Sequence, residues 1–306
     1  MAEESSSFLQ VINKIMDENK DKKDVELLFT FKGVLYPSSL CRAETFEALE
    51  TFETRKDDML VVAYPKCGTN WVFQILHEMV AAIPSSKALP PPRPLLMLEF
   101  GGPEKVLKMK EHPSPRYYVT HLHYDNIPKS FLENKVKMLV VFRNPKDAAI
   151  SYYHFYNKNP LLPNVSSWDN FFQKFMNGEV AWNSYFKHAV AWDKHMDEEN
   201  IMIITYEELK ENLLEGIKQI ADFYELPLSE EMIKSVADKT TFQAMSSKSP
   251  ETLGSFAPVI FRKGEVGDWK TLFTEAQSKE MDAKFEACLA GTKLGAKLKY
   301  DKYCKF

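Results

Sequence analysis

The chain has 306 residues, enough for one large α/β domain, and no linker rich in Gly, Ser or Pro divides it into halves. Its 39 basic and 43 acidic side chains leave a net charge of −4, which argues against a nucleic-acid partner. The four cysteines show no paired spacing, and polar residues rather than a signal pattern follow Met1. No apolar run approaches the roughly 20 residues that span a bilayer. We therefore expect a cytoplasmic protein with no membrane partner.

The chain begins with a polar segment. Residues 1–30 are mostly charged or polar and carry a short amphipathic pattern, which predicts an N-terminal helical segment with little function of its own. We expect residues 30–306 to form a single domain.

The next segment predicts an anion-binding loop. An apolar run from Leu60 breaks at Pro65, and residues at helical spacing follow from Asn70. This order predicts a strand, a short loop and a helix N-terminus, where free N–H groups and the helix dipole favour phosphate or sulfate. Lys66 adds a charge, and Gly68 lets the backbone approach a ligand. The loop is no Walker A motif, because Lys66 precedes the only glycine, and these residues alone leave a tight turn with a solvated lysine equally open.

Strands and helices then alternate along the chain. Apolar runs predict three more strands at 117–120, 137–142 and 201–206. Helical spacing predicts a helix that ends near Pro84, followed by helices near 145–156, 168–176, 179–196, 207–224, 229–238 and 275–289. This alternation indicates an α/β fold, a parallel sheet with helices on both faces, whose ligands bind at the carboxyl ends of the strands.

Each of the three later strands runs into polar residues, namely His121, Arg143 and Tyr206. Arg143 and Ser151 flank a helix N-terminus and form a candidate second anion site, and the segment 261–264 is a third basic element. The less specific interpretations stay open from these residues alone. They are a surface salt bridge for Arg143, an exposed turn for 261–264 and a structural role for His121.

Together these segments resemble the cytosolic sulfotransferases, which use 3′-phosphoadenosine 5′-phosphosulfate (PAPS) as donor and release 3′-phosphoadenosine 5′-phosphate (PAP). The resemblance is carried by four motifs in family order, which are YPKCGTNW at 64–71, RNPKDAAISYYHFY at 143–156, KTTFQAM at 239–245 and RKGEVGDWK at 262–270. The loop variant is most similar to the family 6 branch. The resemblance implies a single α/β domain with a central parallel β-sheet flanked by helices on both faces, the P-loop-like sulfotransferase fold.

The resemblance also implies roles for individual residues. His121 would be the catalytic base, and Lys66 would stabilise charge on the leaving oxygen. The expected PAPS-binding residues are Lys66, Cys67, Gly68, Thr69, Asn70 and Trp71 for the 5′-phosphosulfate and the adenine side, Arg143 and Ser151 for the 3′-phosphate, Tyr206, Thr240, Thr241, Phe242 and Met245 along the nucleotide, and Phe261, Arg262, Lys263 and Gly264 opposite. No metal site is expected, since no dense cluster of acidic, His or Cys residues occurs.

The expected acceptor is a small lipophilic phenol, steroid, hormone or other alcohol or amine. We predict that its pocket is formed by 95–100, Tyr152, Phe155, Tyr156, 157–165 and 247–258. Two alternatives stay open, a nucleotide-binding module of this fold with little turnover and, less favoured, a P-loop-like kinase.

Three features depart from the family pattern. Val119 stands where most relatives have a lysine that assists the acceptor site. Cys67 and Asn70 replace the usual serine and threonine of the donor loop, and we expect Cys67, beside Lys66 at a helix N-terminus, to have a lowered thiol pKa and to be oxidisable. The segment 270–279 changes two of the four positions of the family's dimerisation signature, which predicts a monomer or a weak, atypical homodimer.

Overall fold

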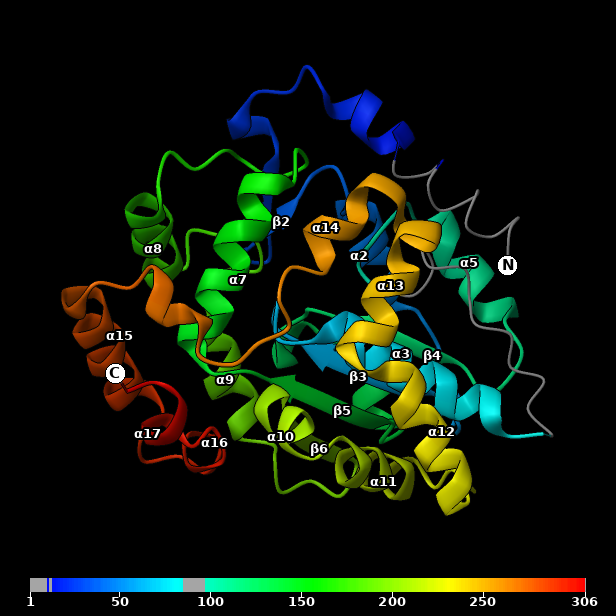
Figure 1. The fold of residues 1–306 in the computed structure, drawn as a ribbon. Coiled ribbons are helices and arrows are strands. Elements are labelled where there is room, and N and C mark those ends of the chain that lie inside the picture. The colour runs from blue at the N-terminus through cyan, green and yellow to red at the C-terminus, as the bar shows by residue number, and fades with distance from the viewer. Residues whose placement is uncertain (1–9, 11–12, 85–96, 306) are drawn as a thin grey trace.

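A four-stranded parallel sheet forms the centre of the computed structural model, which describes Gln10, residues 13–84 and residues 97–305 (Figure 1). The strand order is β4-β3-β5-β6. The strands are β3 (Met59–Ala63), β4 (Tyr117–Thr120), β5 (Lys137–Phe142) and β6 (Ile201–Thr205). All four predicted strands are present, and every residue of β3 is buried, as expected for the middle of a parallel sheet.

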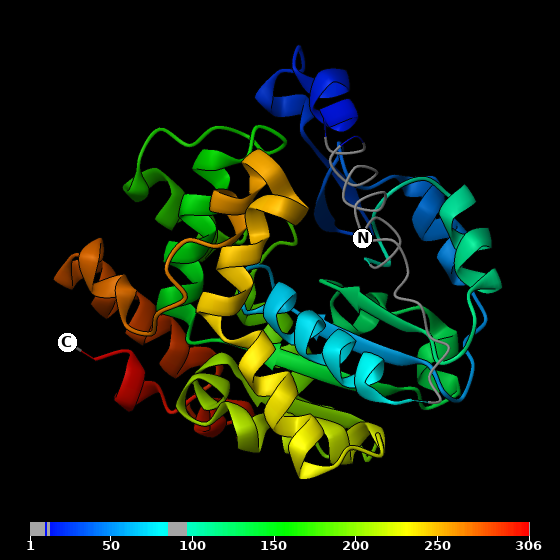
Figure 2. The same ribbon diagram turned by 45° about the vertical axis from the view of Figure 1, so that its right-hand side comes forward.

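Helices cover both faces of this sheet, as Figures 1 and 2 show. The α-helices are α2 (Ala43–Glu50), α3 (Thr69–Ala82), α5 (Glu104–Glu111), α6 (Lys129–Glu133), α7 (Pro145–Lys158), α8 (Trp168–Asn177), α9 (Tyr185–Asp193), α10 (Tyr206–Glu211), α11 (Leu213–Tyr224), α12 (Glu230–Thr240), α13 (Phe242–Leu253), α14 (Ala257–Ile260), α15 (Glu275–Cys288), α16 (Lys293–Lys297) and α17 (Tyr300–Tyr303). Short 3-10 turns are η1 (Asp24–Glu26), η2 (Tyr124–Asn126), η3 (Gly254–Phe256) and η4 (Asp268–Thr271). The predicted α/β fold is confirmed.

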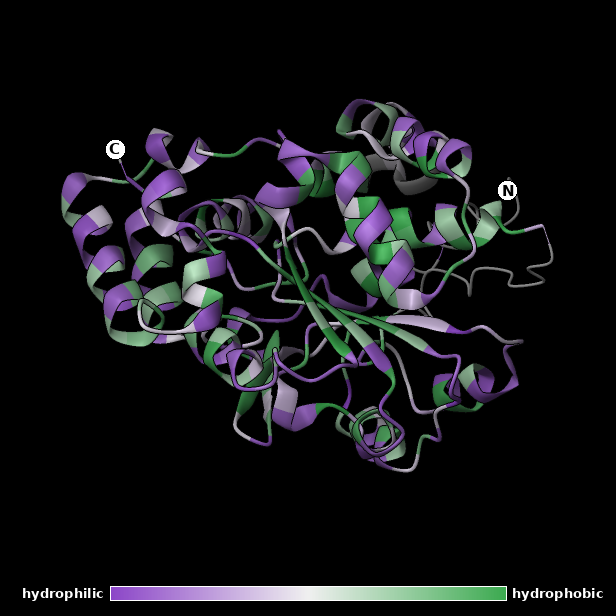
Figure 3. Cartoon of the chain, turned by 90° about the horizontal axis from the view of Figure 1, so that it is seen from below, coloured by the Kyte–Doolittle hydropathy of each residue, from purple (hydrophilic) through white to green (hydrophobic). Residues whose placement is uncertain are grey.

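The helices form two groups around the strands. Helix α12 packs on α3 and α11, and α11 packs on β5. Helix α7 packs on α8 and α15, while α9 packs on α15 and α16. Figure 3 shows apolar strands in the centre and hydrophilic residues on the outward sides of the helices, which places the core between sheet and helices. No helix among the described residues is long and apolar enough to cross a bilayer.

An antiparallel hairpin that the sequence patterns did not predict precedes the sheet. Strands β1 (Leu28–Phe31) and β2 (Val34–Pro37) pair around the two-residue turn Lys32-Gly33. Both turn residues have positive φ, 46° and 77°, the backbone geometry that a tight hairpin turn needs. Residues 13–19 of the N-terminal segment are helical, as predicted, whereas β1 begins at Leu28 inside the same segment. The proline-rich residues 85–96 lie outside the described part.

Two helix predictions are wrong in their bounds. The predicted helix 179–196 begins only at Tyr185, because Trp182 and Asn183 have φ of 59° and 56° and form a turn that cannot continue a right-handed helix. The predicted helix 207–224 is two helices, since the Asn212 side chain accepts a hydrogen bond from the N–H of Glu215 and starts α11 there.

Candidate active site

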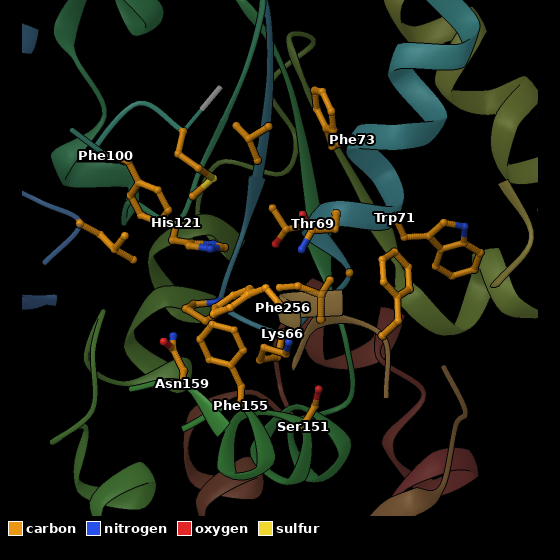
Figure 4. Close-up of a pocket in the computed structure, with 18 of the residues that line it drawn as sticks. Lys66, Thr69, Trp71, Phe73, Phe100, His121, Ser151, Phe155, Asn159 and Phe256 are labelled. Carbon is orange, nitrogen blue, oxygen red and sulfur yellow. The ribbon is translucent and has the colours of Figure 1, made fainter. Parts of the chain in front are cut away.

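A cavity of about 400 Å³ lies at the carboxyl ends of the parallel strands. Its wall includes the residues that directly follow β3, β4, β5 and β6, among them Lys66, His121, Arg143 and Tyr206. Figure 4 shows Lys66 and Ser151 on one side of this cavity and His121 and Phe100 on another. The parallel sheet thus brings together side chains that are up to 140 positions apart in the sequence, from Lys66 to Tyr206.

The loop after β3 has the geometry of an anion site. Gly68 is the N-cap of α3 with φ of 110°, and a Cβ there would lie 3.1 Å from the Tyr206 ring. A glycine therefore suits this position for its backbone and for the close ring. Lys66 also has a positive φ of 69°. Among the described residues, the buried Thr69 hydroxyl has no hydrogen-bond partner, and it lines the cavity.

Lys66 lies in an apolar and positively charged setting. Its Nζ atom is 4.3 Å from the centre of the Phe155 ring, and the two side chains lie together in Figure 4. Burial, followed by the nearby charges of Arg143 and Arg262, lowers the pKa of Lys66 to about 7. The half-buried side chain is thus no ordinary solvated lysine.

Arg143 is held between β5 and α7. Its Nη2 atom donates to the backbone oxygen of Glu265 at 2.7 Å, and its guanidinium group lies 4.3 Å from the centre of the Tyr206 ring. Helix α7 starts just beyond, because the Asn144 side chain accepts from the N–H of Asp147 and Pro145 suits the first helical turn. Ser151, two turns along α7, lines the same cavity. The predicted pairing of Arg143 and Ser151 at one site is consistent with this placement.

The basic segment 261–264 reaches the cavity from the other side. Phe261, Arg262, Lys263 and Gly264 all line it. Gly264 has φ of 68°, and a Cβ there would lie 2.2 Å from a ring carbon of Phe242, so the turn and the aromatic ring both require a glycine. Arg262 and Lys263 therefore line the same cavity as Arg143, which donates to the backbone oxygen of Glu265 in this loop.

Aromatic rings surround the end of the cavity beyond these cations. The Trp71 and Tyr206 ring centres are 5.1 Å apart, and the Phe242 and Phe261 ring centres are 6.1 Å apart. The Trp71 Nε1–H donates to the backbone oxygen of Thr240 at 2.7 Å, which fixes the indole ring. Such flat apolar surfaces suit a heteroaromatic base.

His121 is oriented by two hydrogen bonds. Its Nδ1–H donates to the backbone oxygen of Ala63 at 2.6 Å, and its backbone N–H donates to Glu99 at 2.8 Å. Because a carbonyl oxygen only accepts, Nδ1 carries the proton in the neutral ring and Nε2 keeps its lone pair. Burial lowers the pKa of His121, although Glu99 and the Ala63 hydrogen bond oppose that effect. The ring is therefore a neutral base on the cavity wall.

Apolar side chains from several elements surround His121. Trp182 packs against it with ring centres 4.9 Å apart. The apolar lining residues are Pro37, Leu40, Phe73, Met97, Phe100, Val119, Phe155, Leu161, Leu162, Trp182, Phe256 and Ile260. Phe155, residues of 157–165 and Phe256 thus line the cavity as predicted. Leu95 and Leu96, also expected there, lie outside the described residues.

Several predicted residues do not line this cavity. Tyr152 and Tyr156 are buried in the core, where their hydroxyl groups bond the backbone of Ala181, so their predicted place in the acceptor pocket is wrong. Thr240 is buried behind Trp71, and Thr241 caps α13. Both contribute to the shape of the site rather than to its surface.

Cys67 is also absent from the cavity wall. Its side chain is 0% exposed, and burial raises the pKa of its thiol despite the opposing charge of Arg143. The expectation of a reactive, low-pKa thiol is therefore wrong. A helix N-terminus lowers a thiol pKa only where the thiolate keeps some contact with solvent or with its counter-charges.

Some lining residues were not predicted. Trp182 belongs to no recognised motif and lies on the turn before α9, while Pro37 ends β2 and Leu40 follows the hairpin. Ile15 and Glu18 line the cavity from the N-terminal segment, where little function was expected. An amphipathic pattern in residues 8–15 was the only sequence signal for that contact.

Among the described residues, no group of three or more His, Cys, Asp or Glu side chains is arranged to hold a metal ion. The charged groups of the cavity wall are mainly cationic. They are Arg42, Lys66, Arg143, Lys210, Arg262 and Lys263, with Glu18 as the one acid among the lining residues that the structure describes. This charge favours an anionic ligand.

Comparisons with known proteins agree with this site. Residues 56–293 match the family model of the sulfotransferase domain. The chain is 50% identical to human sulfotransferase 6B1 over 302 residues, 99% of each chain, and 49% identical to the Danio rerio sulfotransferase 6B1 over 95% of this chain and 98% of that one.

Solved structures share the fold. Mouse sulfotransferase SULT7A1, complexed with PAP, matches 90% of this chain and 99% of its own with a TM-score of 0.81 and 30% identity. A retinol dehydratase in complex with androsterone and PAP matches 92% of this chain and 95% of its own with a TM-score of 0.70, but at 19% identity it supports the fold alone. The chain belongs to the cytosolic sulfotransferase family.

Proposed function

We propose that this protein transfers the sulfuryl group of PAPS to a hydroxyl or amine of a small lipophilic acceptor and releases PAP. The observation that carries the proposal is the meeting of two cationic sites and the neutral His121 ring on one cavity. PAPS has two separated anionic groups, so it needs two such sites. The PAP bound to the mouse relative supports the same donor here. The family also supports a cytoplasmic location.

Unpartnered polar atoms fit the donor. Among the described residues, Thr69 Oγ1, Arg143 Nε and Arg262 Nε are buried without a hydrogen-bond partner, and all three residues line the cavity. A buried polar group without a partner costs roughly 1–3 kcal/mol, so a ligand that supplies acceptor oxygens there is favoured.

The residues divide into three binding roles. Lys66 and the N–H groups at the start of α3 hold the 5′-phosphosulfate. Arg143 and Ser151 hold the 3′-phosphate from one side, and Arg262, Lys263 and Gly264 hold it from the other. Trp71, Tyr206, Phe242 and Met245 contact the adenine.

The chemistry follows from the placement of Lys66 and His121. Sulfuryl transfer, like phosphoryl transfer, has a loose transition state, so catalysis depends on in-line positioning and on stabilising charge at the leaving oxygen. Lys66, once protonated, stabilises that charge. His121 Nε2 accepts the proton of the acceptor hydroxyl, and the Ala63 hydrogen bond stabilises the imidazolium that results.

A turnover assay tests the proposal. Radiolabelled PAPS is incubated with a panel of phenols, steroids and aliphatic alcohols, and transfer of label is measured. His121→Ala should lower kcat/KM by roughly 10²–10⁴ while PAP still binds, because only the general base is removed. His195→Ala, which removes a histidine outside the cavity wall, is the matched control. Equal activity of wild type and His121→Ala would contradict the catalytic role.

Thermal unfolding identifies the nucleotide independently of turnover. PAP at about 100 times its Kd should add about 2.7 kcal/mol to the free energy of unfolding. Stabilisation by Mg-ATP instead would favour the kinase alternative. PAP binding without transfer to any acceptor would favour the binding module.

A further inference from the structure

Arg262 and Lys263 share one carboxylate. Asp268 Oδ2 lies 2.6 Å from Arg262 Nη2, and Asp268 Oδ1 lies 2.6 Å from Lys263 Nζ. The Asp268 side chain is 3% exposed, whereas the two cations are 19% and 44% exposed toward the cavity side of the loop. A buried anion therefore lies directly behind the two cations that face the proposed 3′-phosphate.

Other groups fix the backbone of this loop. Asp147 accepts hydrogen bonds from the N–H of Gly267 at 2.7 Å and of Trp269 at 2.9 Å. Arg143 donates to the backbone oxygen of Glu265 at 2.7 Å. The Asp268 side chain is therefore not needed to hold the loop in place, and it is free to act on the cations alone.

Asp268 does not use every donor of Arg262. Asp268 Oδ2 lies 2.6 Å from Arg262 Nη2, whereas Arg262 Nε, among the described residues, is buried without a hydrogen-bond partner. Burial opposes ionisation of Asp268, but Lys263 and Arg262 outweigh it and lower the pKa of the carboxyl group. Asp268 is therefore an anion at neutral pH, and Arg262 retains a donor for a second anion.

We propose that Asp268 is a positioning residue that acts as an internal counter-ion: it keeps Arg262 and Lys263 beside the 3′-phosphate site and competes with that phosphate for their charge. The inference rests on the proposed PAPS site. Its consequence is a limit on affinity for any nucleotide with a 3′-phosphate, which speeds the release of PAP after transfer.

Isothermal titration calorimetry tests the proposal with two ligands and two variants. PAP carries a 3′-phosphate, and 5′-AMP is the same nucleotide without it. Asp268→Asn removes the charge and keeps the shape, and the exposed Glu265→Gln is the matched control, because it removes one negative charge from the same loop. We expect Asp268→Asn to bind PAP about tenfold more tightly, with 5′-AMP unchanged and Glu265→Gln close to wild type for both ligands.

Other results overturn the proposal. Weaker or unchanged PAP binding by Asp268→Asn would assign Asp268 a structural role. An equal increase in affinity for PAP and for 5′-AMP would assign the effect to the net charge of the protein rather than to the 3′-phosphate. If Asp268→Asn does not fold in a melting experiment, Asp268→Ser is measured against the same expectations. Failure of wild type to bind PAP would instead refute the proposed function, and the counter-ion role with it.

Discussion

Lys66, which we propose stabilises charge on the leaving oxygen, lies in an unfavourable place for a charge. Its ammonium group faces the Phe155 ring and two arginines, and its pKa falls to about 7. A bound phosphate or phosphosulfate favours the charged form, so its binding raises this pKa. Near neutral pH, Lys66 therefore takes up a proton when the ligand binds.

This linkage predicts a pH-dependent affinity for PAP. Below about pH 7, Lys66 is charged in both the free and the PAP-bound protein, so its titration does not change the affinity for PAP. Above about pH 7, the affinity for PAP falls by up to about tenfold per pH unit, until the pH reaches the pKa of Lys66 in the PAP-bound protein. Calorimetry in buffers of different ionisation heat should detect proton uptake at pH 8. Lys66→Arg, which stays charged, should show neither the uptake nor the slope. An equal slope in wild type and Lys66→Arg would assign the effect to another group.

At the scale of elements, the turn between α8 and α9 connects three parts of the site. The Asn183 side chain accepts a hydrogen bond from the N–H of Leu35 and donates one to the backbone oxygen of Gly33, both at 2.8 Å. The backbone oxygen of Asn183 accepts a hydrogen bond from the Tyr64 hydroxyl. The preceding Trp182 packs on His121. The hairpin, Tyr64 after β3 and His121 are therefore linked through Trp182 and Asn183, two residues with left-handed backbone.

Asn183→Ala should destabilise the protein by roughly 2–3 kcal/mol, since it removes two hydrogen bonds and places a residue less tolerant of positive φ at 56°. Urea unfolding measures this change. Asn183→Gly is the control, because glycine tolerates this φ and only the side-chain bonds are lost. If Asn183→Gly is as stable as wild type, the side-chain bonds contribute nothing.

Sequence patterns predict the strands of the sheet well but not this turn. The strands follow from continuous apolar runs, and three of the four differ from prediction by no more than one residue because burial on both faces leaves no other pattern. The run from 179 to 196 has helical spacing, yet Trp182 and Asn183 adopt left-handed backbone to satisfy contacts with the distant hairpin. Such long-range contacts leave no local sequence signal.

At the scale of the whole molecule, the cationic side of the cavity was predictable, and the apolar side was predictable only in part. Lys66, Arg143 and Arg262 occur in motifs at strand ends or glycine turns, where backbone geometry and charge identify them. The acceptor wall is assembled from single side chains of the N-terminal segment, the hairpin and α14. Only the packing of the complete chain brings these residues together.

We infer that the segment 270–279 influences the oligomeric state. Thr274, Glu275 and Lys279 are exposed, and the Thr274 hydroxyl caps α15. An exposed glutamate in place of an apolar residue, and a lysine in place of an acid, disfavour the family's small two-fold interface.

We therefore predict a monomer by light scattering at micromolar concentration. The double variant Glu275→Val with Lys279→Glu restores the family pattern and should shift the protein toward a dimer. The single variant Lys279→Glu is the control for charge alone. A tight wild-type dimer that Thr274→Glu dissociates would contradict this prediction.

The hydrogen bond between Ala63 and His121 has a consequence for how acceptor range diverges. Val62 pairs with Thr120, so the residues that follow on β3 and β4 are neighbours by register, and the strand that leads into the donor loop also orients the base. Most apolar residues of the cavity wall come from other segments, among them Leu161 and Phe256. We therefore expect substitutions at these two positions to change acceptor preference while the placement of His121 beside the donor loop is kept, so relatives that differ in substrate should differ at the cavity wall.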